Sequence, residues 1–135
     1  MKDAWIEQAA YEAHRLAATT HPADVRAALE GVHERERNEL PRYVMKAIVD
    51  NSRVAEADQR PICADVGVIR VFVVAGNEAR IEGGFVALEQ AIRRATVRVT
   101  KDLALRSNRV HPINRSNPGN NLGIFAPNLD YRFEP

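Results

Sequence analysis

Residues 1–57 repeat apolar side chains every three or four positions. This spacing places the apolar side chains of residues 4–16 on one face of a helix. A second helix is predicted to begin at Pro22 and a third at Pro41, because proline fits the first helical position. Residues 1–57 are therefore expected to form a helical layer. The apolar positions of these three helices are Trp5, Ile6, Ala9, Ala10, Ala13, Leu16, Val25, Ala28, Leu29, Val32, Tyr43, Val44, Ala47, Ile48, Val54 and Ala57.

The pattern changes after Pro61. Residues 66–76, VGVIRVFVVAG, are rich in β-branched side chains and predict a short, mostly buried strand. Residues 76–84, GNEARIEGG, predict a turn, a second short strand and another turn. Residues 85–105 return to helical spacing, with apolar side chains again recurring every three or four positions.

Residues 106–123, RSNRVHPINRSNPGNNLG, lose all periodicity and predict a long polar loop. Long structured loops often carry function. Residues 128–135 predict a last strand. Helices, then a strand–strand–helix unit, then a loop and a final strand indicate the α+β class. We expect one domain over residues 1–135, with a helical part over 1–57 and an α+β part over 58–135.

Composition narrows the possible functions. The 135 residues are 45% hydrophobic and 27% charged, which is typical of a soluble domain with a real core. A net charge of +1 does not favour nucleic acid or an anionic membrane as a partner. No apolar run approaches the roughly 20 residues of a membrane helix. The N-terminal segment lacks the pattern of a secretory signal, and the single cysteine excludes an internal disulfide, so a cytoplasmic location is expected.

Cys63 stands just before the predicted strand, and two interpretations of it stay open. Free cysteine is often a small buried hydrophobe, which would make Cys63 a core residue. The alternative is a thiolate that binds a metal or cluster. No histidine stands at a ligand spacing from Cys63, so a zinc site built within the chain is not expected.

Asp65 is the second candidate. A carboxylate beside an apolar strand faces solvent or has a partner. It is either a turn residue at the strand entry or an acceptor available for proton chemistry. The loop offers arginines, whose planar guanidinium suits a carboxylate, and amides that fit a polar turn equally well. These residues are Arg106, Arg109, Arg115, Asn108, Asn117, Asn120 and Asn121.

Three stretches occur in one order along the chain. HPADVRAAL is followed by RPICADVGVIRVFVVAG and then by ALRSNRVHPINRSNPGNNLG. They resemble the class I fumarase and L-tartrate dehydratase α-subunit family, whose members carry LPxDVxxAL, RPxCQDTG with a following strand, and LRxNxVHPLxRxNxGxNxG. The resemblance extends over nearly the whole chain.

The resemblance implies a hydro-lyase that adds or removes water at a short dicarboxylate of the fumarate, malate or tartrate type. It implies a [4Fe-4S] cluster held by three cysteines, with an open iron that acts as a Lewis acid. On this basis Cys63 is expected to ligate the cluster and Asp65 to take part in proton transfer. Arg106, Asn117 and Asn121 are expected to bind substrate.

Three positions depart from the family motifs: Ala64 replaces glutamine, Val66 replaces threonine and Pro118 replaces threonine. In the family the α subunit continues further and supplies the other two cluster cysteines. We therefore expect an N-terminal portion that is inactive and binds no cluster by itself. It would work with the remainder of the α subunit and a β subunit or domain, in a homo-oligomer.

A second hypothesis comes from a different class. The chain would be a stand-alone, non-catalytic α+β module that acts in self-association or in binding a partner. The lost glutamine and threonine and the short length favour this alternative. Two cysteines after a GGGSEN-like stretch in a neighbouring reading frame, together with a β subunit, would favour the enzyme instead.

Overall fold

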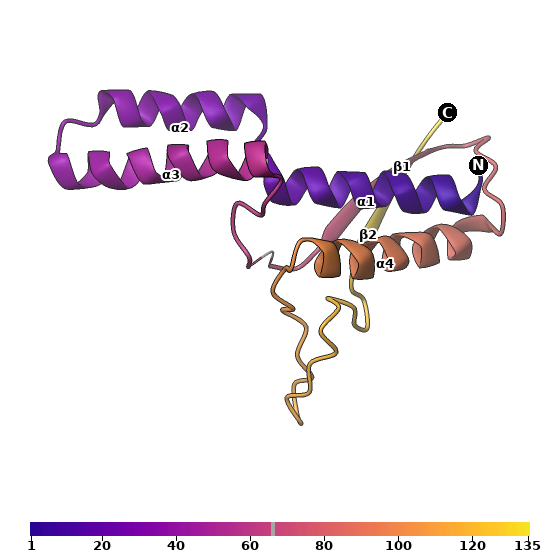
Figure 1. Ribbon diagram of the computed structural model, residues 1–135. Helices are drawn as coiled ribbons and strands as arrows, with labels where there is room; N and C mark the ends of the chain where they lie inside the picture. The colour runs from indigo at the N-terminus through magenta and orange to yellow at the C-terminus, as the bar shows by residue number, and fades with distance from the viewer. Residues whose placement is uncertain (66) are drawn as a thin grey trace. The chain divides into compact units, whose positions relative to one another are not determined.

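Four helices and one two-stranded sheet form in the computed structural model, which describes residues 1–65 and 67–135 (Figure 1). The predicted α+β class is confirmed. The chain divides into two compact units. Residues 1–15 and 64–135 make the α/β unit, and residues 16–63 make the hairpin unit. None of the helices in the described ranges is long and apolar enough to span a membrane.

The hairpin unit is built around two antiparallel helices, α2 (Ala23–Arg35) and α3 (Glu39–Asp58) (Figure 1). Pro22, the predicted first residue of α2, is instead its N-cap with a φ of −54°, so the helix begins one position later than predicted. Helix α3 ends at Asp58, and the C-cap residue Gln59 has a left-handed φ of 52° that turns the chain away. Polar pairs join the two helices, including Arg53 Nη2 to Glu30 Oε1 at 2.8 Å.

The α/β unit contains the first part of α1 (Asp3–Thr19), then β1 (Arg70–Gly76), α4 (Gly84–Asp102) and β2 (Asn128–Glu134). The two strands pair in parallel, with Arg70 opposite Asn128 and Gly76 opposite Glu134. Parallel neighbours need a crossover connection, which α4 and the loop after it provide.

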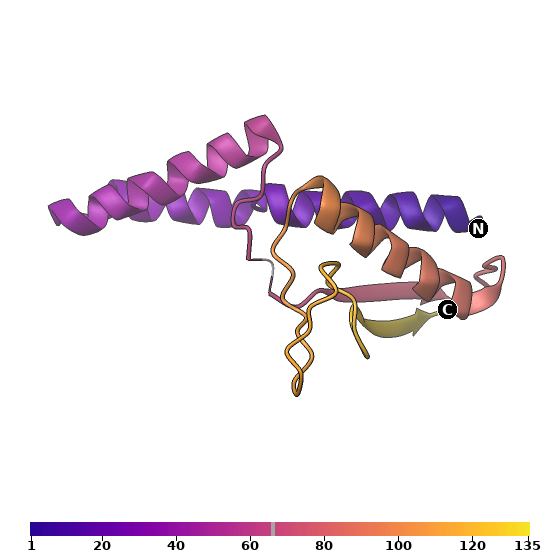
Figure 2. The same cartoon turned by 60° about the horizontal axis from the view of Figure 1, so that its bottom comes forward.

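Apolar residues of α1, α4 and one face of the sheet form the core of this unit. Leu88, Ala91 and Ile92 of α4 pack with Ile6 of α1, and the strand residues Val71, Val73 and Leu129 pack against this cluster. Figure 2 shows both helices on the same side of the two strands. The core is thus a helix pair on one face of a small sheet.

The prediction of a mostly buried strand is wrong for β1. Phe72 is 73% exposed and Val74 is 62% exposed, while Val71 and Val73 are half-buried. The alternation arises because helices cover one face of the sheet and the other face is open. Val66, the first residue of the predicted strand, lies outside the described residues.

The predicted short strand within residues 77–83 is also wrong. These residues form turns that lead directly into α4. Ile81 packs against the core, and the Glu82 amide donates to the Met1 carbonyl at 3.1 Å. β1 pairs with β2 instead, so this segment has no strand partner in the described sheet.

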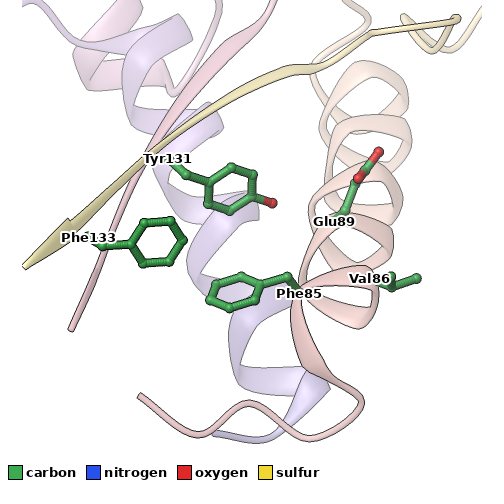
Figure 3. Close-up of a pocket in the computed structure, with 5 residues that line it drawn as sticks. All are labelled: Phe85, Val86, Glu89, Tyr131 and Phe133. Carbon is green, nitrogen blue, oxygen red and sulfur yellow. The ribbon is translucent and has the colours of Figure 1, made fainter. Parts of the chain in front are cut away.

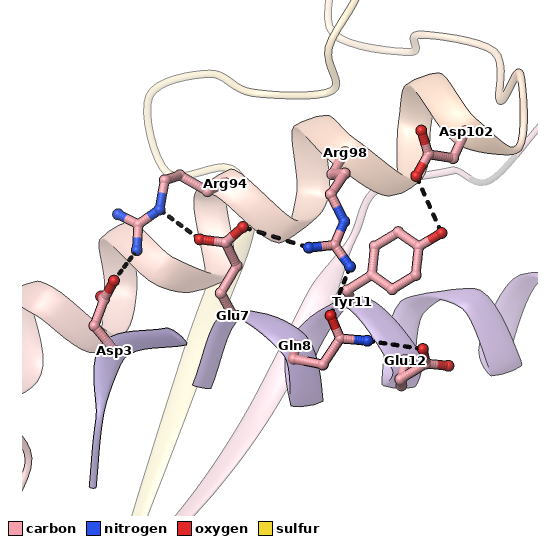
Figure 4. A network of polar contacts seen from close by, with 8 residues as sticks. All are labelled: Asp3, Glu7, Gln8, Tyr11, Glu12, Arg94, Arg98 and Asp102. Atoms are coloured by element: carbon pink, nitrogen blue, oxygen red, sulfur yellow. Dashed lines mark hydrogen bonds and ion pairs between the residues drawn. The ribbon is translucent and has the colours of Figure 1, made fainter. Parts of the chain in front are cut away.

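A polar network on the surface joins α1 to α4 (Figure 4). Arg94 Nε donates to Glu7 Oε2 at 2.7 Å. Closer to the end of α4, Tyr11 Oη donates to Asp102 Oδ2 at 3.1 Å, and the Arg98 guanidinium lies 3.8 Å from the Tyr11 ring centroid. These contacts set how the end of α4 lies against α1, and the loop that bears the candidate site leaves from that end.

Candidate functional site

The candidate site lies where the loop of residues 103–127 leaves α4. Ala104 adopts a left-handed φ of 49°, and the Leu105 amide donates back to the Thr100 carbonyl at 2.9 Å. The Arg106 amide then donates to the Ala64 carbonyl at 2.8 Å. This bond brings the start of the loop beside the segment that carries Asp65.

The Asp65 carboxylate binds two side chains from the loop. Asn108 Nδ2 donates to Asp65 Oδ1 at 2.6 Å, and Arg106 Nη1 lies 3.5 Å from Asp65 Oδ2. Residues two apart in an extended segment point to the same side, which explains how both reach one carboxylate. The Gly67 amide also donates to Oδ1, at 3.2 Å, and its left-handed φ of 63° folds the chain back toward Asp65.

These contacts favour the ionised form of Asp65. The Gly67 amide lowers the pKa of the carboxyl most, followed by the Asn108 amide and the charge of Arg106. The Arg106 and Asp65 side chains are 69% and 52% exposed, so solvent screens their attraction. Asp65 is therefore an accessible, ionised carboxylate that accepts hydrogen bonds.

The side chain of buried Asn121 binds three other residues of the site, Thr100, Arg106 and Asn108. Asn121 is 3% exposed and has a left-handed φ of 57°, a conformation that asparagine tolerates better than most residues. Its Nδ2 donates to the Arg106 carbonyl at 3.1 Å and to Thr100 Oγ1 at 3.3 Å. Its Oδ1 accepts from the Asn108 amide at 2.8 Å. The amide of Asn121 is thus fully used within the protein.

Asn117 pairs with Ser107, which stands between Arg106 and Asn108 in the sequence. Ser107 Oγ donates to Asn117 Oδ1 at 2.7 Å, and Asn117 Nδ2 donates to the Ser107 carbonyl at 2.9 Å. The Gly119 amide donates to the same Oδ1 at 2.9 Å. Asn117 therefore joins the two arms of the loop in the described structure.

Cys63 is exposed at the end of the hairpin unit, so the core-cysteine interpretation is wrong. The preceding residue, Ile62, has both its backbone amide and its backbone carbonyl in hydrogen bonds. The Ile62 amide donates to the Ala18 carbonyl at 2.9 Å, and Asn51 Nδ2 donates to the Ile62 carbonyl at 3.0 Å. An anchored backbone thus presents an accessible thiol.

The chain by itself does not fit a [4Fe-4S] cluster. Such clusters are held by several thiolates, and Cys63 is the one cysteine of the sequence. Among residues 1–65 and 67–135, no group of three or more His, Cys, Asp or Glu side chains is placed to hold a metal ion. Of the three departures from the family motifs, Ala64 and Pro118 are exposed, and Val66 lies outside the described residues.

Asn108 was named among the loop amides that could partner Asp65, but it was not chosen as a site residue. Its amide was one of several in a polar loop, where asparagine serves turns equally well. The available signal was the alternation Arg106–Ser107–Asn108, which places the first and third side chains on one side of an extended segment.

Comparison with known proteins supports the resemblance seen in the motifs. The model of the fumarate hydratase (Fumerase) family matches residues 7–133. A putative L(+)-tartrate dehydratase subunit alpha of Methanocaldococcus jannaschii is 33% identical over 129 residues, which cover 96% of this chain and 45% of that protein. The L(+)-tartrate dehydratase subunit alpha of Escherichia coli K12 is 30% identical over 113 residues, covering 83% of this chain and 36% of its own length. The chain therefore spans less than half the length of these relatives.

Proposed function

Because the chain belongs to the fumarate hydratase (Fumerase) family, we propose that it is part of a hydro-lyase acting on a short dicarboxylate. The substrate would be of the fumarate, malate or tartrate type, and the isolated chain would be inactive. The observation that carries this proposal is the Asp65 carboxylate held by Arg106 and Asn108, since Asp65 and Arg106 occupy the family-motif positions.

Arg106 is proposed to bind a substrate carboxylate. Its guanidinium is 69% exposed and its contact with Asp65 is long, at 3.5 Å. A substrate carboxylate can therefore take up the open donors of the planar guanidinium in a two-point contact. Bound in this way, the arginine stabilises charge that develops when a proton leaves the carbon next to that carboxylate.

Asp65 is proposed to hold or move the proton in this reaction. Like an ordinary aspartate, it is ionised at neutral pH, and its side chain is 52% exposed, which leaves it accessible. An ionised carboxylate can accept a proton from substrate or orient a hydroxyl group. Asn117 and Asn121 stay in the proposed substrate site, where their bonds within the loop support a role in shaping it.

Cys63 is proposed to supply one cluster ligand in an assembled enzyme. Its exposure and anchored backbone support this role. The other ligands would come from further polypeptide, because this chain offers a single thiol.

The proposed partners follow from the family. The relatives above are named alpha subunits, which supports a β subunit or domain and the remainder of an α subunit as partners. We propose a cytoplasmic assembly with more than one copy of each chain.

The test is to purify the chain anaerobically with an α-subunit remainder and a β subunit encoded beside it, and to assay hydration of fumarate and dehydration of malate and tartrate. Asp65→Asn is expected to lower kcat by roughly 10²- to 10⁴-fold, the range typical of a lost proton-transfer group. Arg106→Gln is expected to raise KM by roughly 10- to 100-fold, because it removes charge-assisted hydrogen bonds.

Asp130→Asn and Arg70→Gln are the matched controls. These residues form another exposed Asp–Arg pair of the α/β unit, located on the sheet. Both variants should keep wild-type kinetics. Equal activity of Asp65→Asn and Asp130→Asn would contradict the proposed role of Asp65.

A second candidate function is supported by apolar surface. Phe85, Tyr131 and Phe133 line a shallow pocket of about 330 Å³ together with Val86 and Glu89 (Figure 3). Its aromatic rings meet edge to face at 5.7 Å. Exposed aromatic surface of this kind is typical of an interface, which is what a non-catalytic module for self-association or partner binding would need.

A further inference from the structure

We infer that Asn108 is a positioning residue of the proposed site: its side-chain amide, on a backbone held by buried Asn121, fixes the orientation of the Asp65 carboxylate. The inference rests on the proposed function for its catalytic meaning. Its structural part depends only on the contacts of Asp65, Asn108 and Asn121.

Asn108 contacts both the Asp65 carboxylate and the backbone at Gly67. Asn108 Nδ2 donates to Asp65 Oδ1 at 2.6 Å and also contacts the Gly67 carbonyl at 3.1 Å. These two acceptors flank the turn at Asp65, so the amide holds the side chain and the turn together. With Oδ1 engaged by Asn108 and by the Gly67 amide, Oδ2 is the oxygen that faces Arg106.

The backbone of Asn108 is itself held in place by Asn121. Its backbone amide donates to Asn121 Oδ1 at 2.8 Å, and Asn121 is 3% exposed. Asn121 also binds the Arg106 carbonyl and the Thr100 hydroxyl. One buried amide therefore fixes both ends of the segment that approaches Asp65, and fixes them to α4.

Asn108 makes the shortest of the hydrogen bonds to Asp65, since the Gly67 amide donates to Oδ1 at 3.2 Å. The Asp65 side chain is 52% exposed, and its contact with Arg106 is long and screened by solvent. An exposed carboxylate without a short side-chain bond samples several rotamers. A small misplacement of a catalytic group can cost about 10²-fold in rate, so a residue that selects one rotamer affects turnover without touching substrate.

The structural test uses the 135-residue chain as it is. Three-bond NMR couplings of Asp65 report how its χ1 rotamers are populated. We expect one dominant rotamer in the wild type and averaged couplings in Asn108→Ala. Asn108→Asp keeps the size and the backbone bond to Asn121 but places a negative charge against Asp65, so it should also displace the carboxylate.

Asn114→Ala and Asn114→Asp are matched controls from the same loop. Asn114 accepts bonds from the Ser116 amide and hydroxyl and is exposed. Both control variants should leave the Asp65 couplings unchanged. Averaged couplings in the wild type, or unchanged couplings in both Asn108 variants, would overturn the inference.

The kinetic test uses the assembled enzyme. Asn108→Ala is expected to lower kcat by roughly 10- to 100-fold while KM changes less than about twofold, because Arg106 still binds substrate. Wild-type kcat in a variant whose Asp65 couplings are averaged would also overturn the inference. If the wild-type assembly has no hydro-lyase activity, the proposed function fails, and the NMR result still decides whether Asn108 positions Asp65.

Discussion

Helix α4 supports two regions that are stabilised by different means. Along its length it packs Leu88, Ala91 and Ile92 against α1 and the sheet. At its end, the hydroxyl of Thr100 accepts a hydrogen bond from Asn121, which holds the loop of the candidate site. The first region depends on the burial of apolar area, and the second on a few hydrogen bonds with defined partners.

The difference has a physical consequence for mutation. Apolar burial stabilises roughly in proportion to area and has no directional requirement, so similar apolar residues can replace one another. A hydrogen bond contributes about 0.5–1.5 kcal/mol net, but a buried group left without its partner costs about 1–3 kcal/mol. The core should therefore tolerate conservative change, whereas the loop should not tolerate loss of Asn121.

The largest effect is expected in the core. Leu88→Ala removes a buried side chain that is 7% exposed and should lower the free energy of unfolding of the α/β unit by about 2–5 kcal/mol. Urea unfolding followed by circular dichroism measures this loss. Val86→Ala, on the same helix but 70% exposed, is the matched control and should change it by less than about 0.5 kcal/mol. Equal losses for the two variants would contradict the assigned core.

Asn121→Gly should have a smaller and more local effect. Glycine accepts the left-handed φ of 57°, so the variant removes the side-chain bonds without adding backbone strain. We expect a cost of about 1–3 kcal/mol, because the Asn108 amide and the Arg106 carbonyl lose their partner. Hydrogen exchange should accelerate at the Asn108 amide and stay slow in α4.

The matched control for this loop variant is Asn114→Gly. Asn114 lies at an exposed position of the same loop and has no bond to Asn108 or to Arg106 among its described contacts. Its replacement should leave exchange at Asn108 unchanged. Unchanged exchange in Asn121→Gly as well would show that Asn121 does not hold this segment.

The two regions also differed in how well the sequence predicted them. The helices could be predicted because apolar periodicity is a local property that three or four turns report repeatedly. The burial of β1 was overestimated because its apolar residues alternate between a covered and an open face, and Phe72 gives no local sign of which face it occupies. The parallel pairing of Arg70 with Asn128 joins distant residues, and no local pattern encodes it.

The candidate site was predicted where a motif fixes residue identity. Asp65 and Arg106 were selected through family motifs, and the structure brings them together. Asn108 stands at the asparagine of the same LRxN motif as Arg106, but it was not chosen as a site residue, because a loop asparagine caps a turn as readily as it binds a carboxylate. Only its 2.6 Å contact with Asp65 separates the two roles.

His14, on helix α1, allows a test of how the stability of the protein depends on pH. Burial lowers the pKa of this imidazole from its usual value of about 6.5. Its Nδ1 is buried and has no hydrogen-bond partner in the described structure. The unfolded chain therefore binds a proton at a higher pH than the folded chain, and stability should fall as pH drops below about 6.5 and through the folded pKa.

His14→Gln should reduce this acid sensitivity of the free energy of unfolding. Urea unfolding at a series of pH values from 7.5 down to about 5 would measure it. His21→Gln, which removes a histidine of the hairpin unit, is the control and should retain the His14-dependent loss. A wild-type curve that stays flat across this range, or one unchanged by His14→Gln, would contradict a lowered pKa of this half-buried imidazole.

The smallest effect is expected in the surface network between α1 and α4 (Figure 4). Tyr11→Phe removes the 3.1 Å hydrogen bond to Asp102 but keeps a ring beneath the Arg98 guanidinium. Solvent competes for the exposed hydroxyl and carboxylate, so we expect a loss of only about 0–1 kcal/mol in urea unfolding. Tyr11→Ala should cost more, because it also removes the cation–π contact and the buried part of the ring. Tyr11→Phe and Leu88→Ala could instead lower the free energy of unfolding equally. Surface hydrogen bonds would then stabilise the helix pair as strongly as the apolar core does, which would contradict the contrast between the two regions.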